Sequence, residues 1–281
     1  MLKEKVMRFV FLLAACMAIL SVLLICVFLF TNGIPAFQKI GVLNFLIGTR
    51  WAPGNDIYGI APMIVGTIYV TAGAILVGVP IGIMTAIFMA EFCPEWLYKF
   101  LKPAVQLLAG IPSIIYGFFG LVVLVPLFGQ LFDVSGKNIL TASVLLGIMI
   151  LPTIVSISES AIRAVPRSYY EGSRSLGATH EEAVFTAVVP ASKSGILAGV
   201  VLGIGRAVGE TMAVIMICGN QPAIPEGILS GARTLTANIV LEMGYAADLH
   251  REALIATAVV LFVFILMINF IFSALKRREK A

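Results

Sequence analysis

Charged side chains are scarce in this sequence: Asp, Glu, Lys and Arg make up 12% of the 281 residues, whereas hydrophobic residues make up 60%. The mean hydropathy is +1.03. A water-soluble fold of this length cannot bury so much apolar surface, so lipid must be part of the solvent. The apolar residues form runs near the ~20 residues that a helix needs to cross a bilayer, which excludes a barrel of short alternating strands. The sequence therefore predicts an all-α, polytopic membrane protein.

Cysteine and histidine are also rare, with four and two residues. The cysteines follow no CxxC or His-linked spacing, so we expect neither a metal site nor a disulfide framework. His180 and His250 lie outside every apolar run, and we interpret both as solvated loop residues. Ser113, beside Pro112, has no base near it in the sequence and is expected to pack between helices. We therefore expect no catalytic residue and no cofactor.

A nucleotide-binding loop of the form Gly-x-x-x-x-Gly-Lys-Ser/Thr is missing, and Gly136-Lys137 is the only Gly-Lys pair. Without that loop the chain has no standard cradle for nucleotide phosphates. Any ATP that drives this protein is therefore expected to be bound by a partner.

Six apolar runs are long enough to be spanning helices. Thirteen of the 19 Lys and Arg fall on the side of the two termini and five on the other, while Arg206 lies inside a run. The positive-inside rule then predicts that both termini are cytoplasmic. The runs are 9–30, 63–90, 104–132, 139–158, 195–218 and 253–275.

Three parts are expected along the chain. Residues 1–60 would form an N-terminal spanning helix and an outer loop, since the first run is too long for a secretory signal and lacks a cleavage site. Residues 61–275 would form a core of five spanning helices, which includes a cytoplasmic loop at 159–194. Residues 276–281 would be a basic cytoplasmic tail.

The cytoplasmic loop reads as two short helices. Ser168 with Glu171, and Thr179 with Glu182, each show the Ser/Thr-x-x-Glu pattern of a capping box. We expect the two helices to be separated by a break at Gly177.

A family pattern occupies the same loop. Glu171-Gly172-Ser173 is followed after three residues by Gly177, and after nine more by Ala187-Val188-Val189-Pro190. This spacing resembles the EAA loop of binding-protein-dependent ABC importers, of the type I permease fold, although Gly172, Ser173, Ala187 and Val189 depart from the consensus by small or apolar replacements. The resemblance implies that Glu171, Gly172, Ser173, Gly177 and Pro190 form a coupling element that sits on a separate ATP-hydrolysing subunit.

The fifth apolar run contains charge. Arg206 lies about 16 Å along the helix from Gly195 at 1.5 Å per residue, so we expect it near the middle of the membrane. Glu210 would lie one turn further on the same face. A central Arg costs about 3 kcal/mol on insertion scales, so it needs a partner or a water-filled path. The pair is either a structural ion pair or a contact for an anion in transit.

Further segments resemble the permeases of phosphate-specific ABC importers, and within them the PstC rather than the PstA subunits. The resemblance implies a PstA-like second permease subunit, a PstB-like ATPase dimer, a PstS-like external phosphate-binding protein and phosphate as cargo. The segments are Trp51-Ala52-Pro53, Tyr58-Gly59-Ile60-Ala61-Pro62, Pro80-Ile81-Gly82, Ala109-Gly110-Ile111-Pro112-Ser113-Ile114-Ile115-Tyr116-Gly117, and Gly205-Arg206-Ala207-Val208-Gly209-Glu210-Thr211-Met212-Ala213.

Three other functions compete with this one. A sulfate or molybdate permease would carry a similar coupling loop. An anion channel or secondary transporter would also suit broken helices and a central Arg, but it leaves the coupling-loop spacing unexplained. An intramembrane enzyme lacks a histidine within any apolar run.

Overall fold

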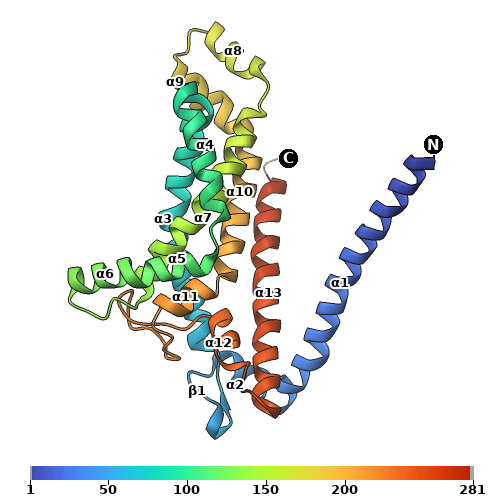
Figure 1. Ribbon diagram of the computed structural model, residues 1–281, viewed down its shortest axis with the longest axis vertical. Helices are drawn as coiled ribbons and strands as arrows, with labels where there is room; N and C mark the ends of the chain where they lie inside the picture. The colour runs from blue at the N-terminus through green and yellow to red at the C-terminus, as the bar shows by residue number, and fades with distance from the viewer. Residues whose placement is uncertain (1, 279–281) are drawn as a thin grey trace.

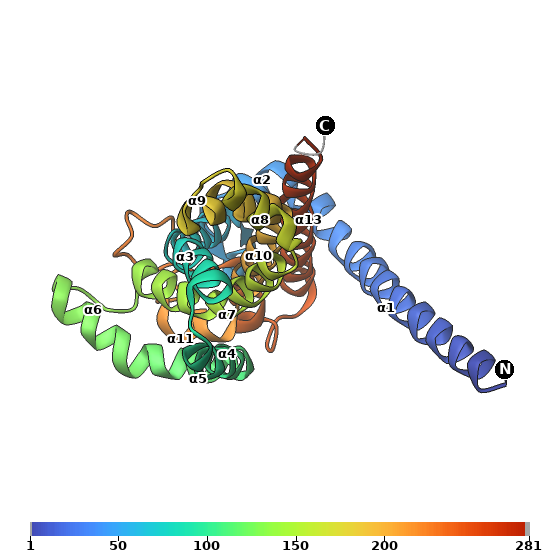
Figure 2. The ribbon, with the colours of Figure 1, turned by 90° about the horizontal axis from the view of Figure 1, so that it is seen from above.

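A computed structural model describes residues 2–278, and it consists of a bundle of long helices with one helix splayed away (Figures 1 and 2). Six helical segments are long and apolar enough to cross a membrane, which confirms the six expected spans. They cover Val6–Ile40, Ala61–Phe92, Ser113–Phe132, Ile139–Arg163, His180–Gly209 and Asp248–Phe272. The expected basic tail lies partly outside the described residues, which end at 278.

Helix α1 (Leu2–Ile40) diverges from the bundle and approaches it only near its C-terminal end, where it meets α13 (Asp248–Arg278) (Figure 1). Phe30 packs edge-on against Phe262 of α13, with ring centroids 6.2 Å apart. None of the most apolar 18-residue window of α1 is buried. In a bilayer, lipid or another chain must therefore cover this helix.

A small lobe closes one end of the bundle, beyond the end of α1. It contains α2 (Val42–Ile47), the two-residue strands β1 (Trp51–Ala52) and β2 (Ile57–Tyr58), and a 3₁₀ turn, η1 (Pro53–Asn55). The strands pair antiparallel, with Trp51 opposite Tyr58. Phe45 and Ile60 are fully buried, so this lobe packs as a satellite core against α13 and α12 (Leu235–Glu242).

The centre of the bundle is formed by α3 (Ala61–Ile87), α7 (Ile139–Arg163) and α10 (Val189–Gly209). Glycine permits the close contact between α3 and α7, because a Cβ atom on Gly78 would lie 2.8 Å from the carbonyl oxygen of Gly147. The Asn138 side chain caps α7 by accepting a hydrogen bond from the Thr141 backbone N–H at 2.9 Å. Leu145 and Ile154 of α7 are fully buried.

The third expected span, 104–132, is not one helix. Helix α4 (Glu95–Gly110) follows the bundle, whereas α5 (Ser113–Phe119), the π-turn η3 (Gly120–Leu124) and α6 (Val125–Phe132) run across it (Figures 1 and 2). The chain breaks at Ile111, which has an extended backbone (φ −70°, ψ 126°). The next residue is Pro112, whose ring disfavours a helical conformation at the preceding position.

The fifth expected span, 195–218, is also interrupted. The continuous segment starts earlier, with α9 (His180–Ala183), the π-turn η4 (Val184–Val188) and α10, and it ends at Gly209. A separate helix, α11 (Met212–Ile217), follows. Another π-turn, η2 (Phe88–Phe92), ends α3, and its Phe92 contacts His180 at the start of this segment.

The connection between the fourth and fifth spans is shorter than the expected 159–194, because α7 continues to Arg163 and the fifth span begins with α9 at His180. It holds α8 (Arg167–Ser175), and Gly177 separates α8 from α9, which confirms two short helices. The capping box of Thr179 and Glu182 is present. The one expected at Ser168 is wrong, because α8 begins at Arg167, two residues earlier than that cap requires, and Pro166 occupies the N-cap position.

Candidate translocation site and coupling segment

Arg206 lies in the last turn of α10, shortly before the separate helix α11. Helices α5 and α11 lie across the bundle at the end of α10 (Figure 1). Its side chain is half-buried, and its Nη1 atom lies 3.4 Å from the hydroxyl oxygen of Thr153 on α7. In the described part of the chain no carboxylate pairs with Arg206. A guanidinium in this position is available to an anion or to water.

Of the two alternatives for Arg206 and Glu210, the structural ion pair is not present in the described structure. Helix α10 ends at Gly209, and Glu210 has an extended backbone (φ −68°, ψ 129°). Its carboxylate instead accepts hydrogen bonds from the backbone N–H groups of Thr211 (3.2 Å) and Ala213 (3.3 Å), at the N-terminal end of α11. A carboxylate is favourable there because the first N–H groups of a helix lack partners within it.

Two helix breaks meet beside Arg206. Gly117 of α5 packs against α11 so closely that a Cβ atom would lie 2.9 Å from the Cα atom of Ala213. The buried Tyr116 donates its hydroxyl hydrogen to the carbonyl oxygen of Leu108 across the α4–α5 break, at 2.9 Å. Tyr116 is also within electrostatic range of Arg206. Sequence reasoning missed Thr153 and Tyr116, because only the packing of α5, α7 and α10 brings them to this Arg.

The residues of the EAA-like pattern lie on α8, directly after it at Gly177, and at the start of α10. Helix α8 stands at the far end of the bundle from the small lobe (Figure 1). Glu171 and Gly172 are exposed on α8, Ser173 is half-buried, and Pro190 lies in the first turn of α10. Leu176, at the end of α8, is 90% exposed. Leu176 lies outside the membrane-spanning helices, so lipid does not cover its side chain.

Gly177 ends α8 with a left-handed backbone (φ 93°). Its N–H donates to the carbonyl oxygen of Arg174 at 3.0 Å, and the following N–H, of Ala178, donates to that of Ser173 at 3.3 Å. These bonds satisfy carbonyl groups that the end of the helix leaves open. Glycine is the residue that adopts this conformation without a steric penalty.

Aromatic contacts attach the coupling segment to the bundle. The Tyr170 hydroxyl of α8 lies 3.0 Å from Nδ1 of His180, and the ring of His180 packs edge-on against Phe92 of η2 at 4.8 Å. Val184 and Val188 of η4 are buried in one cluster with the end of α3. The expectation that His180 is a solvated loop residue is therefore wrong. His180 contacts both Tyr170 of α8 and Phe92 of η2.

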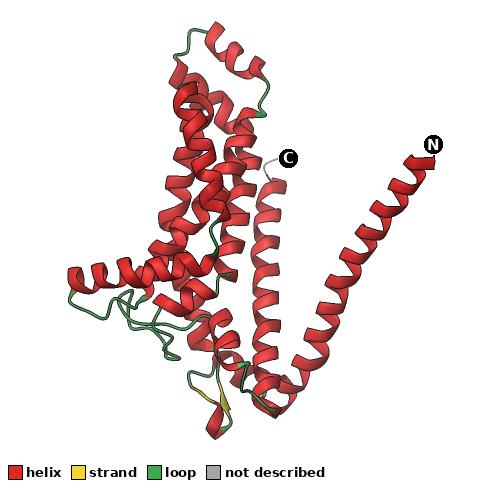
Figure 3. Ribbon diagram, viewed as in Figure 1, coloured by secondary structure: helices red, strands yellow, loops and turns green. Residues whose placement is uncertain are grey.

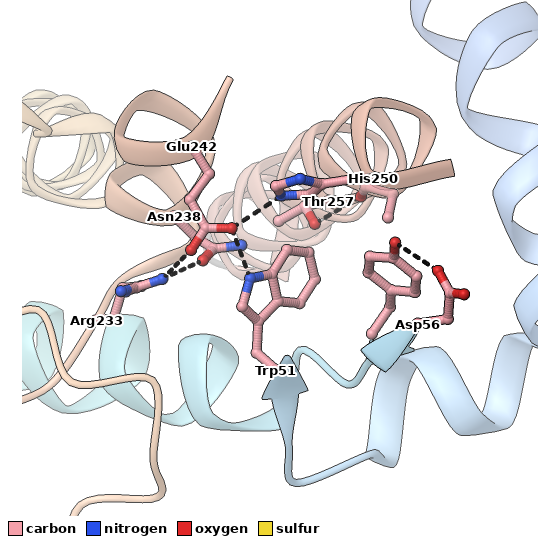
Figure 4. Close-up of polar contacts among 9 residues, drawn as sticks. Trp51, Asp56, Arg233, Asn238, Glu242, His250 and Thr257 are labelled. Atoms are coloured by element: carbon pink, nitrogen blue, oxygen red, sulfur yellow. Dashed lines mark hydrogen bonds and ion pairs between the residues drawn. The ribbon is translucent and has the colours of Figure 1, made fainter. Parts of the chain in front are cut away.

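The small lobe is held by a buried carboxylate, Glu242 of α12 (Figure 4). Its Oε2 atom accepts from Trp51 Nε1 at 2.8 Å and lies 2.9 Å from His250 Nε2, while Oε1 accepts from Arg233 Nη1 at 2.6 Å. The β1–β2 hairpin, the loop that contains Arg233, α12 and α13 are thus all joined by the Glu242 carboxylate, which we call the Glu242 anchor. His250 is therefore not the surface residue that the sequence suggested, since 13% of its side chain is exposed.

Tyr58 of β2 packs edge-on against Trp51 of this anchor, with ring centroids 5.6 Å apart, and its hydroxyl donates to Asp56 at 3.3 Å. Burial, and then the neighbouring Asp56 carboxylate, raise the pKa of Tyr58. Its hydroxyl therefore stays neutral at physiological pH.

Comparison with known proteins gives a consistent result. Residues 78–281 match the model of the family described as binding-protein-dependent transport system inner membrane component. A probable ABC transporter permease, YqgH of Bacillus subtilis, is 40% identical over 90% of this chain and 85% of its own. The phosphate transport system permease protein PstC of Mesorhizobium japonicum is 37% identical over 87% and 81%.

Solved structures show the same fold. A chain of the methionine ABC transporter MetNI, in an inward-facing conformation, superposes with a TM-score of 0.64 at 20% identity, covering 78% of this chain and 95% of its own. A chain of a bacterial alginate ABC transporter gives 0.66 at 16% identity, covering 95% and 94%. At these identities the likeness establishes the architecture of an ABC importer permease and nothing about cargo.

Proposed function

This chain belongs to the family of binding-protein-dependent transport system inner membrane components, and from that premise we propose that it is a permease subunit of an ATP-driven phosphate importer. The observation that carries the proposal is the 37% identity to a phosphate permease over most of both chains, together with the type I importer fold. An archaeal relative named as a probable PstC, from Methanocaldococcus jannaschii, is 33% identical over 88% of this chain.

Arg206 and Glu210 are proposed to line the path of the anion. The guanidinium has no carboxylate partner in the described structure, its planar fork suits phosphate oxygens, and Thr153 adds a hydroxyl beside it. Glu210 orders the start of α11 instead of neutralising Arg206. Broken helices are common around transporter substrate sites, because ends of helices expose polar backbone groups inside the membrane.

The coupling segment is proposed to receive the motion of a separate ATPase dimer. Glu171, Gly172, Ser173 and Gly177 are the proposed contact region, and the exposed Leu176 beside them supports it. Pro190 begins the long helix that leads to Arg206. The other proposed partners are a second permease subunit and an external phosphate-binding protein, and both termini are proposed to be cytoplasmic.

The test is uptake of radiolabelled phosphate into proteoliposomes that contain the complex purified with its partner subunits, with and without ATP and binding protein. Arg206→Gln should abolish most ATP-dependent uptake, because glutamine keeps the polarity but loses the charge and the fork. Thr211→Ser, at the same break, keeps the hydroxyl that donates to the Gly209 carbonyl oxygen, so it serves as the matched control and should transport normally.

Other outcomes discriminate among the alternatives. Phosphate flux without ATP would favour a channel or a secondary carrier. ATP-driven uptake of sulfate or molybdate in place of phosphate would keep the importer and change the cargo. Normal phosphate uptake by the assembled Arg206→Gln complex would make this Arg a structural residue.

A further inference from the structure

A second group of charges lies at the coupling end of the bundle, around Glu159 of α7. The Glu159 side chain is 1% exposed. Its Oε1 atom accepts from Tyr98 Oη at 2.8 Å and from Arg163 Nε at 2.6 Å, and its Oε2 atom is paired with Lys102 Nζ. The carboxylate is therefore fully engaged by three donors. Sequence analysis had left Glu159 at the edge of a loop.

These contacts join three elements. Tyr98 and Lys102 belong to α4, and Glu159 and Arg163 belong to α7. Arg163 Nη2 also donates to the carbonyl oxygen of Met89 in the π-turn η2, at 2.7 Å, and its guanidinium lies 4.3 Å from the centre of the Tyr98 ring. A π-turn displaces the regular hydrogen bonds of a helix, so a side-chain donor can satisfy a carbonyl group there.

Helix α4 has few other means of attachment. None of its 16 residues is buried, whereas α7 is buried along most of its length. Apolar packing therefore contributes little to holding α4, and the Glu159 cluster is its polar link to the bundle. Buried ion pairs add little net stability compared with apolar packing, but they fix one arrangement of the elements they join, because an unpaired charge there is costly.

The position of the cluster connects the two proposed sites. Ile162, one turn from Glu159, is packed in the apolar cluster that contains Val184 and Val188 of η4, next to the coupling segment. The other end of α4 reaches the break at Ile111 and is tied by the Leu108 carbonyl to Tyr116, beside Arg206. Figure 1 shows α4 running between these two levels of the bundle.

We propose that Glu159 and Lys102 are positioning residues that make α4 move with the coupling end of α7, so that displacement of the coupling segment reaches the broken helix beside Arg206. This inference rests on the proposed importer function. It requires no contact between Glu159 and the anion. Rigid elements that switch between two arrangements carry coupling between distant sites.

The experiment measures phosphate transported per ATP hydrolysed, in proteoliposomes holding the complete complex. Glu159→Gln and Lys102→Gln should each lower this ratio about tenfold, a loss of about 1.4 kcal/mol of coupling, while ATP hydrolysis continues. The double variant should lose no more than either single variant, because the two residues act through one contact. Lys99→Gln, on the exposed side of the same helix, is the matched control and should leave the ratio unchanged.

Tyr98→Phe keeps the inference testable if the charge variants fail to assemble, because it removes one donor to Glu159 and keeps the ring beside Arg163. It should lower the ratio by a smaller factor. An unchanged ratio in assembled variants, even with a lower thermal stability, would make the cluster a structural pin and overturn the inference. Absence of ATP-dependent phosphate uptake by the wild-type complex would instead remove the proposed function itself.

Discussion

Glu210 and Gly177 show how single residues set the shape of the proposed sites. Glu210 is placed one turn from Arg206 in the sequence, yet its carboxylate caps α11 because α10 ends at the preceding glycine. Gly177 ends α8 with a left-handed backbone conformation, which is strained for a β-branched residue. In both cases the backbone, rather than the side-chain type, decides the role.

Gly177→Val should uncouple ATP hydrolysis from transport, because a β-branched residue at φ 93° costs about 1 to 2 kcal/mol and would reshape the end of α8. No atom of the described structure lies within 4 Å of the added Cβ, so the effect would come from the backbone alone. Gly177→Asn is the matched control, since asparagine tolerates this conformation. The measurement is ATPase activity and phosphate uptake of the purified complex, and equal behaviour of the two variants would contradict the backbone argument.

Among the elements, the small lobe is held to the helices by one carboxylate instead of a long sheet. Its strands are two residues each, and a hairpin so short has little stability of its own. Glu242 of α12 binds three side chains: Trp51 of β1, Arg233 of the loop before α12, and His250 of α13 (Figure 4). The N-terminal end of α3 thus adjoins contacts between segments 191 residues apart, as between Trp51 and Glu242.

Glu242→Gln should lower the free energy of unfolding of the purified protein by about 3 kcal/mol, because it leaves the largely buried Arg233 guanidinium without its charge partner. Differential scanning calorimetry of the detergent-purified chain measures this change. Glu226→Gln, an exposed carboxylate of the same loop region, should change stability little and is the control. A loss below 1 kcal/mol for Glu242→Gln would show that water replaces the carboxylate at this anchor.

At the scale of the whole molecule, the chain separates into a packed bundle and a helix that the bundle hardly touches. The central helices α3, α7 and α10 bury a common core, while the apolar window of α1 is exposed throughout. The arm formed by α5, η3 and α6 also presents large apolar side chains, such as Phe118 and Leu131, away from the core. In a bilayer, lipid or another chain must cover these surfaces.

Replacement of residues 6–24 by a Leu/Ala helix of equal length should therefore leave the stability of the isolated chain within about 0.5 kcal/mol of wild type. Thermal unfolding of the detergent-purified chain provides the measurement. The same replacement in residues 252–264 of α13, which holds buried Ala253, Leu254 and Ala256, is the contrast and should destabilise it strongly. A large loss from the α1 replacement would show that α1 packs on the bundle more than this structure indicates.

The sequence by itself determined the membrane setting, the number of spans and the two short helices between the fourth and fifth spans, because these follow from local properties: runs of apolar residues, the Thr179–Glu182 capping box and a glycine at the helix break. The break at Pro112 was also present in the sequence, but its consequence, that α5 and α6 turn across the bundle, was not. A proline reports where a helix stops and gives no information on where the chain goes next.

Only the tertiary structure decided which charges meet. Arg206 faces Thr153 rather than Glu210, His250 joins Glu242 rather than solvent, and Glu159 joins Lys102 across 57 residues of sequence. Such contacts depend on how the helices pack, and a one-residue change in where a helix ends turns the next side chain by about 100° at 3.6 residues per turn. Which side chains surround Arg206, Glu242 and Glu159 is therefore a property of the packed bundle.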